Sequence, residues 1–267
     1  MICLETNKSF LKKWLAHPLT RSSNIDDPHT IKLRKLIILE KSFLRHIYIE
    51  WYKSIVSDLP KKDGPILELG SGAGFLRDFI PQLITSDILQ CPEVDIILDG
   101  CELPFADNSL LAIVMTNVFH HLPYPRKFLK EAARCVKIGG VMIMIEPWVT
   151  AWSRLIYRKL HHEPFTPESK TWEFPDTGPL SGANGALPWI IFQRDREIFH
   201  REFPQWQIRK INLDMPFCYI ISGGISLRSF IPGWSFGIFR RLEKLLKPWM
   251  KHIAMFAQIN LLKTYNT

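Results

Sequence analysis

From residue 66 onward, short apolar runs alternate with turn signals and with stretches that have helical periodicity. The apolar runs are residues 66–69, 83–86, 94–98, 110–116 and 141–145. Helical patterns fall between several of these runs, most clearly at residues 125–136. Strands that alternate with helices predict βαβ units, so we expect an α/β fold with a mostly parallel, doubly wound sheet.

The segments on either side of this alternating region have different patterns. Before it, residues 30–59 carry apolar side chains four positions apart, which predicts a helical extension at the N-terminus. After it, residues 148–227 are rich in Pro, Gly and aromatic residues and predict an elaborated insert or cap. Residues 236–263 predict a basic, amphipathic helical tail that is interrupted at Pro248.

We therefore expect one compact domain with three parts. The N-terminal extension covers residues 1–60, and the Rossmann-like core covers residues 61–150. Residues 151–267 then supply the remainder of the sheet, a cap on the substrate side and the basic tail.

The sharpest local signal is the sequence ELGSGAG at residues 68–74, which lies after one predicted strand and before a predicted helix. Glycines allow a tight turn and bring bare backbone N–H groups close to a ligand. The spacing is G-x-G-x-G, whereas the dinucleotide fingerprint has its third glycine one residue later. A tight turn without a ligand is the alternative reading of these residues.

Polar residues at the ends of the other predicted strands support the interpretation of the glycine loop as part of a ligand-binding site. Asp87 ends the second strand, where an acidic residue meets ribose hydroxyls in nucleotide-binding sheets. Asp99 and Gly100 end the third strand, and Asn117 ends the fourth. Because the carboxyl ends of parallel strands share one edge of the sheet, we expect these residues to line one crevice.

The phrases ILELGSGAGF, ITSD, DGCELPFADNSL, NVFHHL and FLKEAARCVKIGGVMIMIEP follow one another from Ile66 to Pro147. This region resembles class I S-adenosylmethionine-dependent methyltransferases of the type-11 family. The resemblance implies a Rossmann-like, seven-stranded sheet, with S-adenosylmethionine as the methyl donor. The donor-binding residues that it implies are Glu68, Gly70, Ser71, Gly72, Gly74, Asp87, Asp99, Gly100, Cys101 and Asn117.

Within this resemblance, Asp87 holds the ribose, and adenine lies beside Asp99 and Gly100. Cys101 is a departure, since relatives often carry alanine there. From Trp148 onward the chain resembles, more loosely, methyltransferases found among bacterial surface-polysaccharide genes.

Methyl transfer from a sulfonium depends above all on alignment and desolvation, and it needs a general base only for a hydroxyl or carbon-acid acceptor. His121 is the candidate base, and His120 is a candidate substrate-binding residue; packing in the wall of the site is the alternative for both. His162 and Arg194 are further candidates for substrate binding. We predict no metal site, because the neighbouring residues His161, His162 and Glu163 would point in different directions on a helix.

The composition of the chain indicates the cellular compartment of the protein. Five scattered cysteines among 267 residues form no disulfide framework or zinc module, and no long apolar segment suggests a signal peptide or a membrane span. We therefore expect a cytoplasmic protein.

The net charge of +8 is concentrated at the two ends of the chain. Residues 1–65 carry +5, residues 66–227 carry −3, and residues 228–267 carry +6. Basic, aromatic-rich ends suit an anionic membrane surface, and solvated helix faces are the alternative. The C-terminal tail is therefore a candidate for peripheral membrane contact, on the inner face of the membrane.

The function that we predict is methyl transfer to a small-molecule acceptor, with a sugar nucleotide, a lipid-linked glycan or a quinone as candidates. The alternative is a non-catalytic S-adenosylmethionine-binding module that docks to a membrane or a partner protein. A nicotinamide oxidoreductase is disfavoured by the glycine spacing. We expect no nucleic acid substrate, because the fourth strand is not followed by the signature of enzymes that flip a base.

Overall fold

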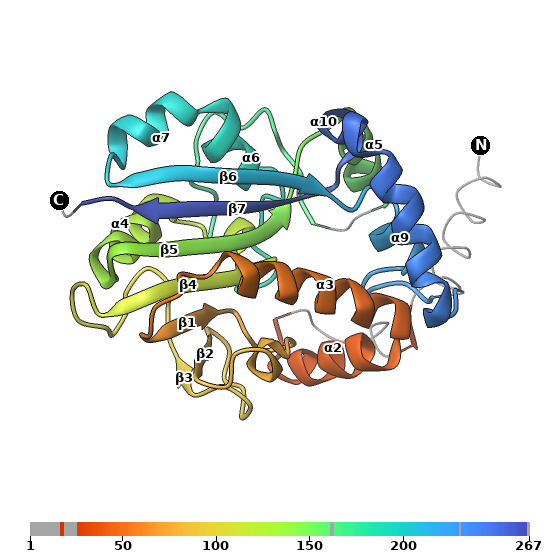
Figure 1. The fold of residues 1–267 in the computed structure, drawn as a ribbon, viewed down its shortest axis with the longest axis horizontal. Coiled ribbons are helices and arrows are strands. Elements are labelled where there is room, and N and C mark those ends of the chain that lie inside the picture. The colour runs from red at the N-terminus through yellow and green to blue at the C-terminus, as the bar shows by residue number, and fades with distance from the viewer. Residues whose placement is uncertain (1–16, 19–25, 161–162, 230, 266–267) are drawn as a thin grey trace.

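The computed structural model describes residues 17–18, 26–160, 163–229 and 231–265. A seven-stranded sheet crosses the molecule in the order β3-β2-β1-β4-β5-β7-β6 (Figure 1). The strands are β1 (Ile66–Leu69), β2 (Leu83–Asp87), β3 (Ile96–Ile97), β4 (Leu110–Thr116), β5 (Val136–Pro147), β6 (Trp206–Asp214) and β7 (Phe256–Lys263). β7 pairs antiparallel with β5 and β6, whereas β1 to β5 pair in parallel, which confirms the predicted mostly parallel sheet.

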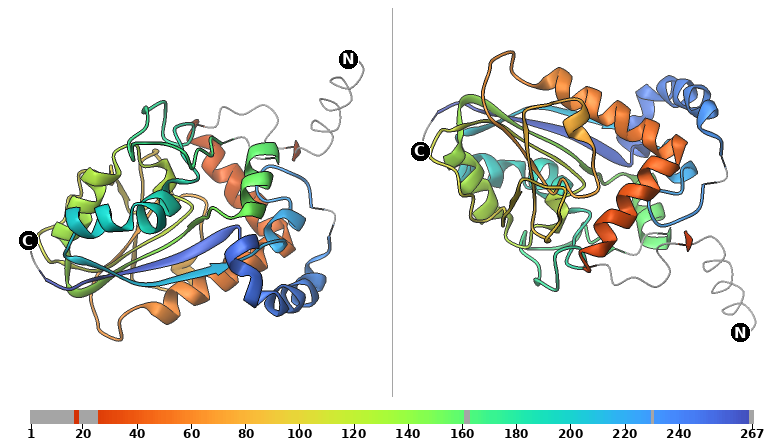
Figure 2. Two further views of the ribbon diagram at one scale, coloured as in Figure 1. Left: turned by 90° about the horizontal axis from the view of Figure 1, so that it is seen from above. Right: turned by 90° about the horizontal axis from the view of Figure 1, so that it is seen from below.

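Helices cover both faces of the sheet. Helix α3 (Ser42–Asp58) lies on one face, and α4 (Pro125–Cys135) and α7 (Arg196–Glu202) lie on the other (Figure 2). In α3 the residues Ile47, Trp51 and Ile55 recur every four positions and are all buried, so they form the stripe that packs on the sheet. Strand β4 is buried over six of its seven residues, as expected for a central parallel strand with both faces covered.

The predicted N-terminal helical extension forms, but as two helices instead of one. Helix α2 (His29–Glu40) ends at Lys41, and α3 begins at the next residue. The ammonium group of Lys41 is buried and donates hydrogen bonds to the carbonyl oxygens of Gly224 and Leu227, the latter at 2.8 Å. This side chain therefore ties the helical extension to the C-terminal half of the chain.

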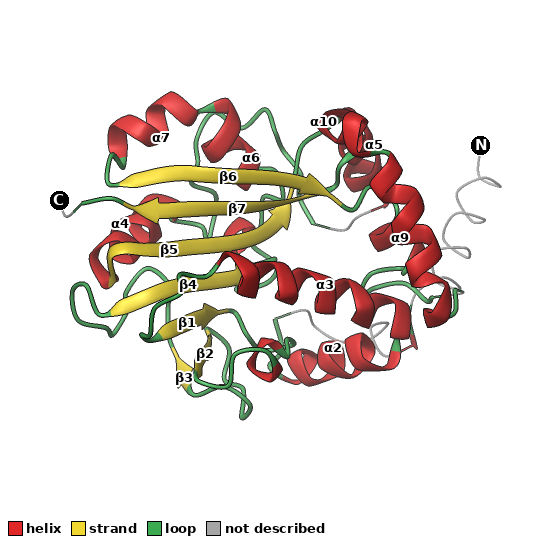
Figure 3. Cartoon of the chain, in the orientation of Figure 1, coloured by secondary structure: helices red, strands yellow, loops and turns green. Residues whose placement is uncertain are grey.

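The connections between the first four strands contain almost no helix (Figure 3). The helix predicted after the glycine loop is absent, and a single 3₁₀ turn, η2 (Leu76–Asp78), stands in its place. Pro81 stands two residues before β2, and Tyr52 of α3 packs against Phe75 and Phe79 of the segment between β1 and β2. Strand β3 is also shorter than predicted, because only Ile96 and Ile97 pair with β2.

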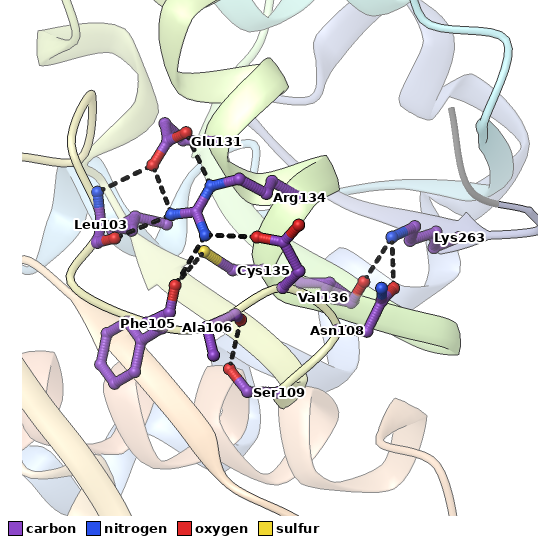
Figure 4. Close-up of polar contacts among 11 residues, drawn as sticks. Leu103, Phe105, Ala106, Asn108, Ser109, Glu131, Arg134, Cys135, Val136 and Lys263 are labelled. Atoms are coloured by element: carbon purple, nitrogen blue, oxygen red, sulfur yellow. Dashed lines mark hydrogen bonds and ion pairs between the residues drawn. The ribbon is translucent and has the colours of Figure 1, made fainter.

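The long connection from β3 to β4 is fixed by one arginine (Figure 4). The guanidinium of Arg134, at the end of α4, donates to the carbonyl oxygens of Phe105 at 2.7 Å and Leu103 at 2.9 Å. It also forms ion pairs with Asp107 and Glu131, both at 2.8 Å. These bonds hold the segment that runs from the predicted donor-binding residues 99–101, after β3, to the start of β4.

The C-terminal part of the chain contains the last two strands of the sheet, and it departs from the sequence prediction at the end of the tail. The predicted insert at 148–227 contains β6, and the predicted helical tail at 236–263 ends in β7, which lies between β5 and β6. The helical part of the tail comprises α9 (Phe236–Leu245), the turn η6 (Lys247–Trp249) and α10 (Met250–Ile253). Strand β7 is buried along almost its whole length, although Gln258 and Asn260 are polar. These two residues alternate with the apolar residues Ala257, Ile259 and Leu261, a pattern typical of a strand that the prediction of a helical tail missed.

Three further helices and three short turns complete the elements of the described residues. They are the 3₁₀ turn η3 (Phe119–His121), α5 (Ala151–Leu160), α6 (Leu187–Trp189), the π-helical turn η4 (Ile190–Arg194), α8 (Cys218–Ile221) and the 3₁₀ turn η5 (Gly233–Ser235).

Candidate active site

A cavity of about 840 Å³ lies at the edge of the sheet where the parallel strands end. The carboxyl ends of β1, β2 and β4 supply Gly70, Asp87 and Asn117 to its wall, and residues 99–101 after β3 line it as well. Open α/β sheets bind ligands at this edge, where the loops diverge to opposite faces. Six of the predicted donor-binding residues therefore share one cavity.

Two glycines of the loop are required by its geometry. Gly70 has φ +69°, in the left-handed region that favours glycine, and a Cβ there would lie 2.4 Å from Cγ2 of Val118. A Cβ on Gly72 would lie 2.7 Å from both the carboxylate of Asp87 and Cγ2 of Ile31 in α2. The backbone N–H of Gly72 donates to Oδ2 of Asp87 at 3.1 Å. Glycine at position 72 thus allows both Asp87 and the N-terminal extension to approach the loop.

The N–H groups of this loop are largely used within the protein. Ser71 donates to the carbonyl of Ser86 at 2.8 Å, and Gly74 donates to the carbonyl of Ser71 at 2.7 Å. The N–H of Phe75 donates to the hydroxyl of Tyr52 in α3 at 3.3 Å. The prediction that bare N–H groups would face a ligand therefore does not hold for Ser71, Gly72 and Gly74. The loop instead supplies a close-fitting wall and fixes Asp87.

The two acidic residues of the donor side have different surroundings. Glu68 is 3% exposed and lies behind the loop, outside the cavity wall, where burial raises the pKa of its carboxyl to about 7. Asp87 faces the cavity, and burial raises the pKa of its carboxyl, although the N–H groups of Leu89 and Gly72 act in the opposite direction. Asp87 is therefore the acidic side chain of this pair that a ligand can reach.

The residues after β3 and β4 complete the donor side. The N–H of Cys101 donates to Oδ1 of Asp99 at 2.8 Å, which closes the turn after β3. Burial and the neighbouring Asp99 raise the pKa of the Cys101 thiol to about 12, so this side chain is a neutral wall group. Asn117 has φ +57°, and its N–H donates to the carbonyl of Ile145 in β5 at 2.8 Å. A non-glycine residue in this conformation turns the chain sharply out of β4 into the cavity.

His120 lies across the cavity and is held by a buried carboxylate. Its Nδ1 is 2.6 Å from Oε2 of Glu146 at the end of β5, and both side chains are almost fully buried. The other oxygen, Oε1, accepts the N–H groups of Val118 and Phe119, each at 2.8 Å. Glu146 therefore positions both the turn after β4 and the imidazole of His120.

His121 and Glu163 complete a cluster with His120, which we name the histidine–glutamate cluster. Nδ1 of His121 lies 3.0 Å from the carbonyl oxygen of Gly182, so it carries the hydrogen and donates it. Nε2 of His121 lies 3.9 Å from Oε1 of Glu163, and Nε2 of His120 lies 3.4 Å from Oε2 of the same carboxylate. All three side chains line the cavity.

The two histidines have opposite electrostatic properties. Burial alone would lower the pKa of His120, but the carboxylates of Glu146 and Glu163 outweigh it and raise this pKa to about 10. Burial, followed by the neighbouring charge of His120, lowers the pKa of His121 to about 3. An imidazole with such a low pKa is a weak base at neutral pH.

Aromatic side chains form much of the remaining wall. Tyr48 comes from α3, Tyr157 from α5 and Tyr219 from α8, and Phe165 and Phe256 lie beside them. Ring centroids of Tyr157 and Phe165 are 4.7 Å apart, as are those of Tyr219 and Phe256. This side of the cavity suits a flat or apolar molecule.

The two remaining predicted substrate-binding residues are His162 and Arg194. His162 lies outside the described residues. Arg194 does not line the cavity: its guanidinium pairs with Asp195 at 2.8 Å and donates to the carbonyl oxygens of Pro167 and Ser169. These contacts give Arg194 a role in fixing the chain of the cap.

Sequence reasoning missed Glu146 as a site residue. The signal was present, because Glu146 ends β5 on the same edge of the sheet as the acidic ends of β2 and β3. The pairing of Glu163 with His120 and His121 had no local signal, since the residues come close only through the fold.

Comparison with known proteins agrees with this geometry. Residues 67–144 match the model of the methyltransferase domain family. The chain is also 29% identical over 123 residues to the demethylmenaquinone methyltransferase of Paenarthrobacter aurescens (strain TC1). This similarity covers 39% of the chain and 49% of that relative, so the chain spans about half the length of the curated protein it matches.

Solved structures share the fold across most of the chain. A methyltransferase in complex with the Trm112 activator of Haloferax volcanii has a TM-score of 0.53 at 12% identity, covering 91% of this chain and 99% of that one. An S-adenosylmethionine-dependent methyltransferase of Thermotoga maritima has a TM-score of 0.52 at 17% identity, covering 89% and 100%. Geranyl diphosphate C-methyltransferase of Streptomyces coelicolor has a TM-score of 0.51 at 11% identity, covering 94% and 90%.

The fold and the donor side of the cavity define a nucleotide-type ligand site on a Rossmann-like sheet. With the match of residues 67–144 to the methyltransferase domain family, they support a class I S-adenosylmethionine-dependent methyltransferase domain of the type-11 family in this part of the chain. The resemblance found in the sequence is thereby confirmed.

Proposed function

We propose that the protein transfers a methyl group from S-adenosylmethionine to a lipophilic small molecule, of which a quinol or a lipid-linked glycan is the class we favour. The observation that carries this proposal is the single cavity that joins the donor side to the histidine–glutamate cluster and the aromatic wall. Its volume of about 840 Å³ is near the upper end of the ~300–1,000 Å³ typical of ligand pockets, which leaves room for donor and acceptor together.

The charges of the cavity wall support a lipophilic acceptor over a sugar nucleotide. Among the described residues that line the cavity, Arg34 is the one lysine or arginine, whereas Asp87, Asp99, Glu163 and Asp176 are acidic. A diphosphate would require several cationic groups or a helix N-terminus, and the expected helix after the glycine loop is missing. The aromatic wall instead matches a ring or a prenyl chain. The demethylmenaquinone methyltransferase relative, although similar over only part of its length, supports a quinol.

The test begins with calorimetric titration of the protein with S-adenosylmethionine and, separately, with NADH. Micromolar binding of S-adenosylmethionine alone is the expected result. Methyl transfer is then measured by mass spectrometry with three probes: a short-chain demethylmenaquinol, a polyprenyl-linked monosaccharide and UDP-N-acetylglucosamine. Methylation of one of the first two supports the proposal, and methylation of the sugar nucleotide alone overturns the assignment of the acceptor class. Donor binding with no methylated product in any assay favours a non-catalytic binding module.

We further propose that the protein docks to an anionic membrane through α9 and the segment around it. Large apolar side chains with 54–78% exposure lie three or four positions apart on one face of this segment. They are Trp234, Ile238, Leu242, Leu245 and Trp249. The exposed residues Arg241, Lys244, Lys247 and Lys251 accompany them, which complements an anionic lipid surface. No helix in the described part of the chain is long and apolar enough to cross a bilayer.

The position of α9 connects this surface with the proposed acceptor. The helix lies beyond the carboxyl ends of the parallel strands, on the side of the molecule that holds the cavity (Figure 1). Residues 225–227, which precede α9, line the cavity wall. A lipid-linked acceptor would therefore reach the cavity from the same side on which the protein meets the membrane.

Substitution tests this membrane contact better than truncation, because removal of residues 236–267 would also remove β7 from the sheet. Co-sedimentation is measured with vesicles of phosphatidylglycerol and phosphatidylcholine, and with phosphatidylcholine alone. The double change Leu242→Ser and Leu245→Ser should reduce binding at least tenfold, since a buried leucine contributes about 1.5–3 kcal/mol. The matched change Ile97→Ser and Ile138→Ser, at similarly exposed positions elsewhere, should leave binding intact. Absence of vesicle binding by the unaltered protein would overturn this proposal.

A further inference from the structure

The histidine–glutamate cluster brings together three side chains that metal ions bind. Candidate ligand atoms of His120, His121 and Glu163 all lie within 4.8 Å of one another. The measured contacts are 3.4 Å from His120 Nε2 and 3.9 Å from His121 Nε2 to the two oxygens of Glu163. Ligand atoms bound to one zinc-sized ion at ~2.0–2.2 Å are roughly 3–3.5 Å apart. Only small side-chain movements are needed to enclose an ion here.

The hydrogen bond of His121 determines which of its ring nitrogens can bind a cation. The carbonyl oxygen of Gly182 only accepts, so Nδ1 of His121 carries the hydrogen and Nε2 presents a lone pair. Nε2 lies 3.9 Å from Oε1 of Glu163, so one cation near both atoms could be bound by the imidazole and the carboxylate together.

The groups behind the two imidazoles match the surroundings of metal-binding histidines. Such histidines almost always donate their second ring N–H to a carboxylate, a backbone carbonyl or a water molecule. Nδ1 of His120 lies 2.6 Å from the carboxylate of Glu146, and Nδ1 of His121 lies 3.0 Å from the carbonyl of Gly182. Both imidazoles are thus oriented with Nε2 toward the same carboxylate, and a cation bound there would replace the hydrogen that the raised pKa of His120 keeps on its Nε2.

We propose that His120, His121 and Glu163 bind one divalent transition-metal cation, of the zinc or ferrous class, with its remaining coordination positions open to the cavity. Two imidazoles and one carboxylate suit these ions, and three protein ligands are typical of sites that also bind a reactant. The sequence prediction of no metal site considered Glu163 together with its neighbours in the chain. The fold instead brings Glu163 to two residues that follow β4.

The role of this ion in catalysis rests on the proposed function, whereas the ion site itself does not. A cation held by His120, His121 and Glu163 would lower the pKa of a hydroxyl of the acceptor, whose proton would pass to solvent. The hydroxyl oxygen would attack the methyl carbon of the sulfonium. A carbon–oxygen bond forms, the carbon–sulfur bond breaks with its electron pair going to sulfur, and a neutral thioether remains.

The test uses the untagged full-length protein after treatment with a chelator. Calorimetry with ZnCl₂ should show one saturable site, and CoCl₂ should give the visible absorption bands of a protein-bound cobalt ion. Glu163→Gln and His121→Gln should each weaken Zn²⁺ binding at least 100-fold, since even the outer partners of such ligands change affinity 10–100-fold. His200→Gln, which removes an exposed histidine of α7, should leave the affinity unchanged.

Thermal melting and titration with S-adenosylmethionine establish that each variant is folded. Absence of a saturable Zn²⁺ site, or affinity that Glu163→Gln and His121→Gln leave unchanged, overturns the metal site. If the protein binds no Zn²⁺ and still transfers methyl groups after chelation, the proposed metal site is wrong and the proposed methyltransferase activity stands. Saturable Zn²⁺ binding by a protein that does not bind S-adenosylmethionine retains the ion site and rejects the proposed function.

Discussion

The two sides of the cavity are built in different ways. On the donor side, backbone geometry dominates: a left-handed glycine at position 70, a close approach at Gly72, and one reachable carboxylate at Asp87. On the proposed acceptor side, the wall consists of side chains from distant parts of the chain, such as His120, Tyr157 and Glu163. All members of a methyltransferase family bind the same donor, so a fixed backbone geometry can form its binding site. Their acceptors differ, and side chains that vary from one protein to the next can bind them.

The largest effect that this comparison predicts is at Gly70. Gly70→Ala should weaken S-adenosylmethionine binding more than 100-fold, because a Cβ would lie 2.4 Å from Val118 and would have to adopt φ +69°. Gly139→Ala is the matched control: its φ is +77°, yet nothing lies within 4 Å of the added Cβ. Both variants carry the cost of a left-handed alanine, about 1–2 kcal/mol, but only the first should lose the donor in a calorimetric titration. Equal donor binding by both would show that the shape of the loop is not what holds the donor.

The next effect concerns the carboxylate that the backbone positions. Asp87→Ala removes the acceptor of the Gly72 and Leu89 N–H groups as well as the ribose partner implied by the family resemblance. We expect donor affinity to fall about 10–100-fold, as for the loss of a charged hydrogen bond of ~1.5–3 kcal/mol. Asp78→Ala, an exposed acid in η2, serves as the control. Unchanged affinity in the Asp87 variant would contradict its place in the donor site.

Local sequence signals predicted the donor side better than the acceptor side. Residues 66–87 contain β1, the glycine loop and Asp87 in one continuous stretch, so pattern and spacing suffice to place them together. Glu163 meets His120 only because the segment after α5 folds back across the sheet, and no local pattern records that approach. The sheet itself shows the same limit: β1 to β5 follow one another in sequence, whereas β7 enters between β5 and β6 from the far end of the chain.

The sequence also could not show that Glu68 is hidden behind the loop. Burial raises the pKa of its carboxyl from 4.5 to about 7, so the unfolded chain loses this proton at lower pH than the folded protein does. The stabilising effect is complete below pH 4.5 and is lost as pH rises to about 7. A shift of this size corresponds to at most about 3 kcal/mol.

Glu68→Gln keeps the shape and removes the titration. The unaltered protein should therefore lose more unfolding free energy than the variant does between pH 5 and pH 8, as measured by urea denaturation at both values. Glu102→Gln, at an exposed acid, should follow the unaltered protein. Equal losses in the Glu68 variant and the unaltered protein would mean that Glu68 is ionised in the fold at neutral pH. The donor side would then carry two buried negative charges.

The smallest effect is expected at Cys101, where the side chain lies on the donor side but the backbone does the positioning. Its N–H closes the turn with Asp99, while its thiol makes one weak contact, 3.7 Å from the carbonyl of Tyr124. Cys101→Ala keeps the N–H and should change S-adenosylmethionine affinity less than about threefold, well under the ~1.4 kcal/mol of a tenfold change. Cys101→Ile also keeps the N–H but adds bulk to the cavity wall, so it should weaken binding at least tenfold. If the alanine variant lost as much affinity as the isoleucine variant, the thiol itself would be a binding group, and the donor side would depend on side chains as the acceptor side does.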